Sequence, residues 1–141
     1  MHKKVGIING PNLNLLGQRQ SDIYGDISFN VFLKKLQDKY EGVDIRYFQS
    51  NIEGELINEI QNIGFNMDGI ILNAGAYTHT SVAIGDAVAA IKCPVIEVHI
   101  SNVFSREDFR KFSYLSSVCV GQITGLGLSG YELALRYFLE L

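Results

Sequence analysis

The stretch GIILNAGAYTHTS, residues 69–81, decides the fold, because an apolar run stops abruptly there at polar residues. Its first part, Gly69–Leu72, is a short continuous run of the kind found in strands that are buried on both faces. Ligands of open parallel sheets bind beyond the carboxyl ends of such strands. Asn73 and His79 come at that position, so we expect a functional site there.

Strand-like and helix-like segments alternate about five times along the chain. Short apolar runs predict strands at 4–9, 43–48, 69–72, 95–99 and 118–121. Apolar residues three and four positions apart predict helices from Ser28 to Gly42, from 56 to a stop at Gly64, over 82–91 and around 131–138. The pattern predicts an α/β fold with a flavodoxin-like, doubly wound, five-stranded parallel sheet and helices on both faces.

Length and charge limit the class of protein. The 141 residues suit one domain, 1–141. With 12 basic and 15 acidic residues, the net charge of -3 gives no field that would attract nucleic acid or an anionic membrane. No apolar run reaches the ~18 residues of a membrane span, and the apolar run before Asn9 is too short for a signal peptide. We expect a cytoplasmic protein.

The sequence offers no ligand set for a metal or a cofactor. Cys93 and Cys119 have apolar neighbours, which favours buried thiols over a disulfide or a metal pair. A phosphate-binding glycine pattern is missing after the first strand, and Gly125–Gly130 matches such a pattern only weakly and follows the last strand. No lysine lies at a strand end as a Schiff-base candidate. We therefore expect chemistry without a cofactor.

Parallel strands must bring three polar segments to one edge of the sheet, namely Asn9–Asn12, Asn73–His79 and Glu97–Asn102. Two of the three histidines, His79 and His99, fall in these segments. A lone histidine is more often structural than functional, but two at strand ends among asparagines and serines favour a site.

Glu97 and His99 are two residues apart on an expected strand, so their side chains point to the same face. A carboxylate beside an imidazole fixes its tautomer and favours the imidazolium, as a general acid or base requires. The alternative is a strand-end charge paired with a lysine. Because the strand is expected to be buried, where an unpaired glutamate is costly, the catalytic interpretation is favoured.

Three of the arginines, Arg19, Arg106 and Arg110, lie in the two long loops expected at this edge. They could bind an anionic substrate through the guanidinium fork or be solvated loop residues, and spacing alone leaves both open. Tyr24 lies five residues from Arg19, and a tyrosine can act as a base only if its pKa of ~10 is lowered, as a nearby arginine does. For a lone loop tyrosine, a packing role is the more common alternative.

Asp86 lies inside an otherwise apolar predicted helix, Val82–Ile91. It follows His79 by seven residues, so the two would share a face if the helix began that early. A helix that is apolar nearly all round suits burial at an oligomer interface. We expect Asp86 to find its partner in the pocket or on another subunit.

Three motifs are spread over almost the whole chain: GPNLNLLG at 10–17 with Arg19 and Tyr24, NAGAYTHTS at 73–81, and EVHISN at 97–102 with Arg106 and Arg110. In this order they resemble type II 3-dehydroquinate dehydratase. The resemblance implies a lyase that removes water from 3-dehydroquinate by anti elimination through an enolate, giving 3-dehydroshikimate without a cofactor. It also implies a homo-oligomer, usually a dodecamer built as a tetramer of trimers.

The resemblance also implies roles for individual residues. Tyr24 resembles the base that removes the C2 proton, and Arg19 the group that lowers its pKa. Asn12 would hold a water that stabilises the enolate, and His99, oriented by Glu97, would protonate the leaving hydroxyl. The substrate-binding residues would be Asn73, His79, Asp86 from a neighbouring subunit, Ile100, Ser101, Arg106 and Arg110.

Several positions depart from the family pattern. Gln20 and Ser21 stand where the family usually has Glu-Pro, Ala74 where proline is common, and Ile52 where histidine is common. None of these changes removes a catalytic group, although the first concerns the stiffness of the Tyr24 loop. A non-catalytic flavodoxin-like module that binds a small anionic metabolite is the alternative. The sequence leaves open whether the enzyme serves the shikimate pathway of aromatic amino acid biosynthesis or the breakdown of quinate.

Overall fold

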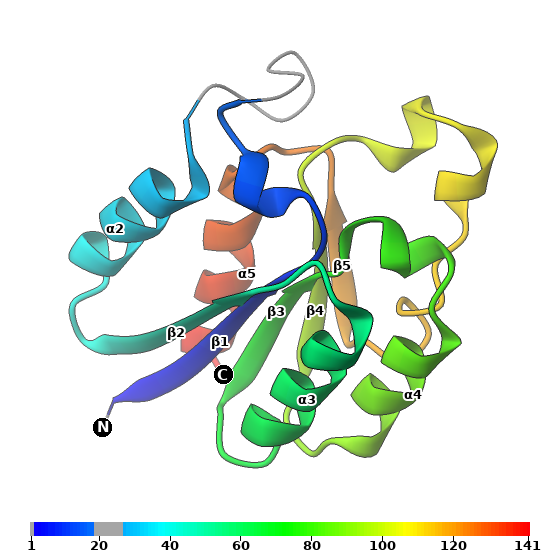
Figure 1. Ribbon diagram of the computed structural model, residues 1–141. Coiled ribbons are helices and arrows are strands. Elements are labelled where there is room, and N and C mark those ends of the chain that lie inside the picture. Colours follow the sequence, from blue (N-terminus) through cyan, green and yellow to red (C-terminus); the bar gives the residue numbers. More distant parts are fainter. Residues whose placement is uncertain (1, 19–26) are drawn as a thin grey trace.

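The computed structural model describes residues 2–18 and 27–141, and these form a parallel sheet between two layers of helices (Figure 1). The strands are β1 (Lys3–Asn9), β2 (Val43–Gln49), β3 (Gly69–Asn73), β4 (Val95–His99) and β5 (Gly121–Thr124). The helices are α2 (Phe29–Lys39), α3 (Glu53–Ile63), α4 (Val82–Ala90) and α5 (Ser129–Leu139). The 3-10 turns are η1 (Leu13–Leu15), η2 (Gly75–His79), η3 (Val103–Ser105) and η4 (Asp108–Lys111).

The sheet order is β2-β1-β3-β4-β5, and every neighbouring pair is parallel. This is the flavodoxin-like order, so the predicted fold class is confirmed. The order reverses direction between β1 and β3, and this switch point is where open α/β sheets bind ligands.

Both faces of the central strands are buried. Ile7 and Ile71 pack with α2 and α5 on one face, whereas Ile8 and Leu72 pack with α3 and α4 on the other. Successive strand residues point to opposite faces, which explains why an unbroken apolar run was needed. The two cores hold the sheet rigid beneath its carboxyl edge.

The helix boundaries mostly follow the expected caps. The Ser28 hydroxyl accepts a hydrogen bond from the Val31 amide (3.3 Å), which confirms the start of α2. The predicted end at Gly42 is late, because α2 stops at Lys39 and Tyr40 leaves the helix to donate to Glu132 of α5 (2.6 Å). The stop of α3 at Gly64 is confirmed.

The predicted last strand over 118–121 is wrong, because the strand that pairs with β4 is Gly121–Thr124. The amides of Val118 and Cys119 both bond to the Leu115 carbonyl (3.0 Å each), which makes this apolar segment a turn. Pairing along the ladder with β4 begins only at Gly121.

Cys93 and Cys119 are free, partly buried thiols that pack against the core formed with α3 and α4, as expected from their neighbours. Burial raises the pKa of Cys93 to about 11 and that of Cys119 to about 12, so both are neutral near pH 7. Within the described ranges, no group of three histidine, cysteine or acidic side chains could hold a metal ion. No helix there is long and apolar enough to cross a membrane.

Candidate active site

A cleft lies at the carboxyl ends of β1, β3 and β4, where the sequence predicts the site. Among the described residues that line it, two are arginines and two are histidines, and none is acidic. The cleft therefore suits an anionic ligand. Its lining consists of Pro11, Asn12, Leu13, Asn73, Gly75, Ala76, His79, His99, Ile100, Ser101, Val103, Arg106 and Arg110.

Asn73 forms the floor of the cleft, and its amide is fixed at both ends. Its Nδ2 donates to the Tyr131 hydroxyl (2.8 Å), which in turn donates to Asn9 Oδ1 (2.7 Å). Its Oδ1 accepts from the Gly75 amide (3.1 Å). Tyr131 was predicted only as an apolar position of α5, because nothing in its spacing shows a polar partner in β3.

The loop after β1 is held against this floor by its backbone. The Gly10 amide donates to the Asn73 carbonyl (2.7 Å), and a Cβ at Gly10 would lie 2.5 Å from the Ala74 carbonyl oxygen. Asn12 adopts the left-handed conformation (φ 69°), and its amide donates to Asn51 Oδ1 (2.9 Å). These contacts place Asn12 at the rim of the cleft, as predicted.

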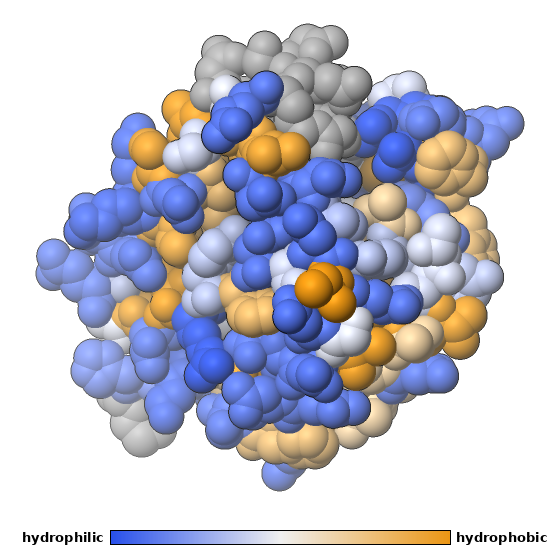
Figure 2. All heavy atoms as spheres, in the orientation of Figure 1, coloured by the Kyte–Doolittle hydropathy of each residue, from blue (hydrophilic) through white to orange (hydrophobic). Residues whose placement is uncertain are grey.

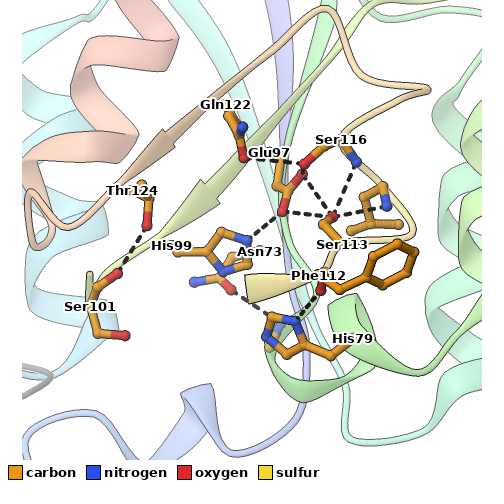
Figure 3. A network of polar contacts seen from close by, with 12 residues as sticks. Asn73, His79, Glu97, His99, Ser101, Phe112, Ser113, Ser116, Gln122 and Thr124 are labelled. Atoms are coloured by element: carbon orange, nitrogen blue, oxygen red, sulfur yellow. Dashed lines mark hydrogen bonds and ion pairs between the residues drawn. The ribbon is translucent and has the colours of Figure 1, made fainter. Parts of the chain in front are cut away.

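Glu97 and His99 form the predicted pair, with 2.5 Å between Glu97 Oε2 and His99 Nε2 (Figure 3). Only 1% of Glu97 is exposed. Burial alone would raise the pKa of Glu97, but hydrogen bonds from His99, Ser116 and Ser113 together hold it below its ordinary value. Among the described residues its partners are a histidine and serines, so the lysine alternative is wrong.

The contact with Glu97 determines which ring nitrogen of His99 carries a proton. Because the carboxylate of Glu97 only accepts hydrogen bonds, Nε2 of His99 carries a proton, which leaves Nδ1 as the atom that can exchange a proton. His99 itself lines the cleft. The geometry is that of a general acid or base whose ring is oriented from behind.

His79 is oriented by a different neighbour. Its Nδ1 lies 2.6 Å from the Phe112 carbonyl oxygen, an acceptor, so Nδ1 carries the proton and Nε2 is left as an acceptor while the ring is neutral. Burial lowers the pKa of His79 more than the hydrogen bond to Phe112 raises it, and the positive charges of His99 and Arg110 lower the pKa further. The rings of His79 and His99 are stacked with centroids 6.1 Å apart.

Arg106 and Arg110 both line the cleft. Arg110 Nε donates to Glu107 Oε1 (2.9 Å), and Arg106 Nη1 donates to Ser101 Oγ (3.1 Å). Their side chains are only 19% and 16% exposed. The predicted residues Arg19 and Tyr24 lie outside the described residues.

The end of β4 is supported by the glycine turn before α5. The amides of Gly125 and Gly127 donate to the carbonyls of His99 (3.2 Å) and Ile100 (3.0 Å). Gly125 has φ +87° with its would-be Cβ 3.1 Å from Asn102, so a side chain there would be strained. The weak glycine pattern at 125–130 therefore serves to place Ile100 and Ser101.

The condition under which Asp86 would share a helix face with His79 is not met. Ser81 caps α4 by accepting from the Ile84 amide (2.9 Å), and α4 begins at Val82, after His79 has ended η2. Asp86 is exposed and is not among the residues that line this cleft.

Ser113, Ser116 and the Phe112 carbonyl were missed by the sequence reasoning. They contact Glu97 and His79 from the segment FSYLS, residues 112–116, which follows η4 and mixes polar and apolar residues without a periodic pattern. No signal in a single sequence could have assigned these contacts, because they bridge from 16 to 33 residues of chain.

Comparison with known proteins agrees with this geometry. The family described as "Dehydroquinase class II" matches residues 3–139. The 3-dehydroquinate dehydratase of Fusobacterium nucleatum is 52% identical, with 97% of each chain covered, and that of Exiguobacterium sp. is 51% identical, with 97% of this chain and 94% of the relative covered. The crystal structure of type II dehydroquinase from Butyrivibrio crossotus superposes with a TM-score of 0.94 at 46% identity, covering 98% of each chain. This chain belongs to the class II dehydroquinase family.

Proposed function

We propose that this chain is a single-domain lyase that dehydrates 3-dehydroquinate to 3-dehydroshikimate. The observation that carries the proposal is the cleft that joins Arg106, Arg110 and the Glu97–His99 pair without an acidic lining residue among those described. The substrate has a carboxylate for the arginines to bind and a hydroxyl that needs a proton to leave. The names of the relatives, 3-dehydroquinate dehydratase, support the same reaction.

The elimination needs one base and one acid. A base removes the C2 proton, which is acidic because the C3 ketone can take the charge as an enolate. The C1 hydroxyl then leaves with a proton from His99, so that a C1–C2 double bond and one water form. His99 ends neutral and Glu97 stabilises its charged form beforehand. Through the family resemblance, Tyr24 is the base, Arg19 lowers its pKa, and Asn12 holds a water at the enolate.

The remaining cleft residues bind the substrate. Arg110 and Arg106 bind the carboxylate, while Asn73 and the neutral His79 contact hydroxyls. The amides of Ile100 and Ser101 contribute further hydrogen bonds.

Asp86 serves the cleft of a neighbouring subunit in a homo-oligomer, which we propose is a dodecamer. Exposed apolar side chains support an interface: Val82 of α4 is 55% exposed, and hydrophobic surface gathers on the α4 side of the face seen in Figure 2. Sedimentation should therefore give a large assembly, and a monomer would contradict this proposal.

The activity is tested by adding 3-dehydroquinate and following the ultraviolet absorbance of the enone product. Turnover is expected, and Tyr24→Phe should reduce kcat by at least about 10²-fold. The matched control is Tyr137→Phe, because Tyr137 is exposed on α5, and it should behave like the wild type. Binding of citrate or quinate without any turnover would instead identify a non-catalytic metabolite-binding module.

A cytoplasmic location is part of the proposal, supported by the free thiols of Cys93 and Cys119, which are usual in reducing compartments. The reaction fits the shikimate pathway of aromatic amino acid biosynthesis. Growth of a deletion strain without aromatic amino acids would test that role against quinate breakdown.

A further inference from the structure

We infer that Ser113 and Ser116 are positioning residues that hold Glu97 ionised and aimed at His99. The segment 112–116 would thereby set the protonation of the general acid without touching substrate. The inference rests on the proposed function for its effect on rate, whereas its effect on Glu97 can be measured in the protein alone.

The hydroxyl of Ser113 has only one direction for its proton. The amides of Leu115 (2.9 Å) and Ser116 (3.1 Å) both donate to Ser113 Oγ and so fill its lone pairs. Its proton is left to point at Glu97, whose Oε1 and Oε2 lie 3.1 and 3.0 Å away. Ser113 is therefore a donor that is oriented before the reaction starts.

Ser116 supplies the second donor. Its Oγ lies 2.6 Å from Glu97 Oε1 and 3.1 Å from Gln122 Oε1. One hydroxyl proton cannot serve two acceptors, and the shorter contact assigns it to Glu97. Glu97 then has His99 on Oε2 and Ser116 on Oε1, with Ser113 between them (Figure 3).

These donors replace the water that a carboxylate normally requires. An ionised carboxylate that is almost fully buried is costly unless it is paired and hydrogen-bonded. Removing a donor destabilises the charged form of Glu97, whether His99 is neutral or protonated. Glu97 would therefore take up a proton at higher pH. A protonated Glu97 cannot stabilise the imidazolium of His99.

The segment itself is firmly anchored. Leu115 is fully buried in the core with α3 and α4, and the Tyr114 amide donates to the Thr78 carbonyl (2.9 Å). One residue before Ser113, the Phe112 carbonyl accepts from His79. The same segment therefore contacts the His79 imidazole directly and the His99 imidazole through Glu97.

Other titratable groups face Glu97 as well. His99 is on β4, Cys119 lies in the turn before β5, and His79 lies in η2, with Arg110 acting on His79 from η4. The Cys119 thiol stays neutral because burial and the charge of Glu97 raise its pKa to about 12. Cys119 therefore adds no charge beside Glu97 near pH 7.

The test compares Ser116→Ala, the rescue variant Ser116→Thr and the control Ser117→Ala, an exposed serine one residue on. The first readout is a carbon-13 NMR titration of glutamate-labelled protein, in which Glu97→Gln identifies the Glu97 resonance. The second readout is the pH profile of kcat. For Ser116→Ala we expect Glu97 to titrate about one pH unit higher, with the acid limb of the kcat profile moving by the same amount. Ser116→Thr should restore the wild-type titration of Glu97 and the wild-type acid limb of kcat. Ser113→Ala should shift both to higher pH, as Ser116→Ala does.

The inference is overturned if Glu97 titrates in Ser116→Ala as it does in Ser117→Ala. If Ser116→Ala does not fold, Ser116→Cys gives the same comparison, because a thiol is a weaker donor of similar shape. If Glu97 titrates at higher pH in Ser116→Ala but the wild-type protein shows no turnover of 3-dehydroquinate, the proposed function is wrong and the positioning role stands. Turnover without the shift would do the reverse.

Discussion

Asn9 and Asn73 are register partners on β1 and β3, and their side chains meet at one hydroxyl, that of Tyr131. The hydroxyl donates to Asn9 and accepts from Asn73, and all three residues are almost completely buried. Tyr131 belongs to α5, which packs on one face of the sheet. A helix behind the sheet therefore sets the orientation of an amide that faces the cleft.

Tyr131→Phe removes only this hydroxyl and takes its hydrogen bond from two buried atoms, Asn73 Nδ2 and Asn9 Oδ1. We expect the free energy of unfolding to fall by about 1–3 kcal/mol and KM to rise more than kcat falls, because Asn73 binds rather than reacts. Urea denaturation and steady-state kinetics measure the two effects. Tyr137→Phe, at an exposed position of α5, is the control, and equal behaviour of the two variants would contradict the role of the hydroxyl.

Glu97→Gln keeps the shape of the side chain but removes the charge that stabilises the His99 imidazolium. We expect kcat to fall by about 10²–10⁴-fold with a smaller change in KM, because the loss concerns proton transfer. The exposed Glu41→Gln is a matched control that should keep wild-type kinetics. A variant with nearly full kcat would show that Glu97 is only structural.

Burial lowers the pKa of His79 below its ordinary value of 6.5, so the folded protein binds a proton there less readily than the unfolded chain. The contribution of His79 to the free energy of unfolding is fully present above pH 6.5, and it declines as the pH falls below that value toward the pKa of the folded state. We expect the free energy of unfolding to rise with pH over this window in the wild type. His79→Gln should flatten that slope, whereas Ser117→Ala, at an exposed position without a titratable group, should not.

Gly85 allows α4 to lie against the segment that carries Ser113. A Cβ at Gly85 would be 2.7 Å from the Tyr114 carbonyl oxygen, so Gly85→Ala should lower the free energy of unfolding by about 1–3 kcal/mol. Gly54 in α3 has nothing within 4 Å of its would-be Cβ. There, alanine should instead stabilise by about 0.5–1 kcal/mol through helix propensity, and thermal denaturation distinguishes the two signs.

The position of the cleft could be predicted because parallel strands allow only one arrangement of their ends. Once the apolar runs before Asn9, Asn73 and His99 were identified as strands, their polar ends had to meet. The error at β5 has the opposite cause. Val118 and its neighbours are apolar enough for a strand, but their backbone is satisfied by a turn at Leu115, and one sequence does not show which solution is used.

The supporting contacts of the site could not be predicted in the same way. Ser113 and Ser116 are small polar residues in a mixed segment without a periodic pattern, and their role depends on Glu97, which lies 16 and 19 residues away in the chain. Tyr131 has the spacing of a core residue, and its ring is indeed buried in the core. Only its hydroxyl contacts the site, by accepting a hydrogen bond from Asn73. Periodicity reports which face of an element is buried, and it does not report which single atom on that face needs a partner.

Phe112 and Ser113 are adjacent in sequence, yet they serve different histidines of the cleft. The Phe112 carbonyl accepts from His79, whereas Ser113 donates to Glu97, the partner of His99. Inserting or deleting one residue near this point would displace one contact relative to the other, whatever side chains filled the segment. The side chain of Phe112 is exposed and packs edge-on against Tyr114, whereas the contact with His79 uses only the Phe112 carbonyl oxygen. The length of the segment 112–116 is therefore more tightly constrained than its composition. In a mutant library selected for activity, single-codon insertions and deletions in this segment should be depleted, whereas many substitutions at Phe112 should survive.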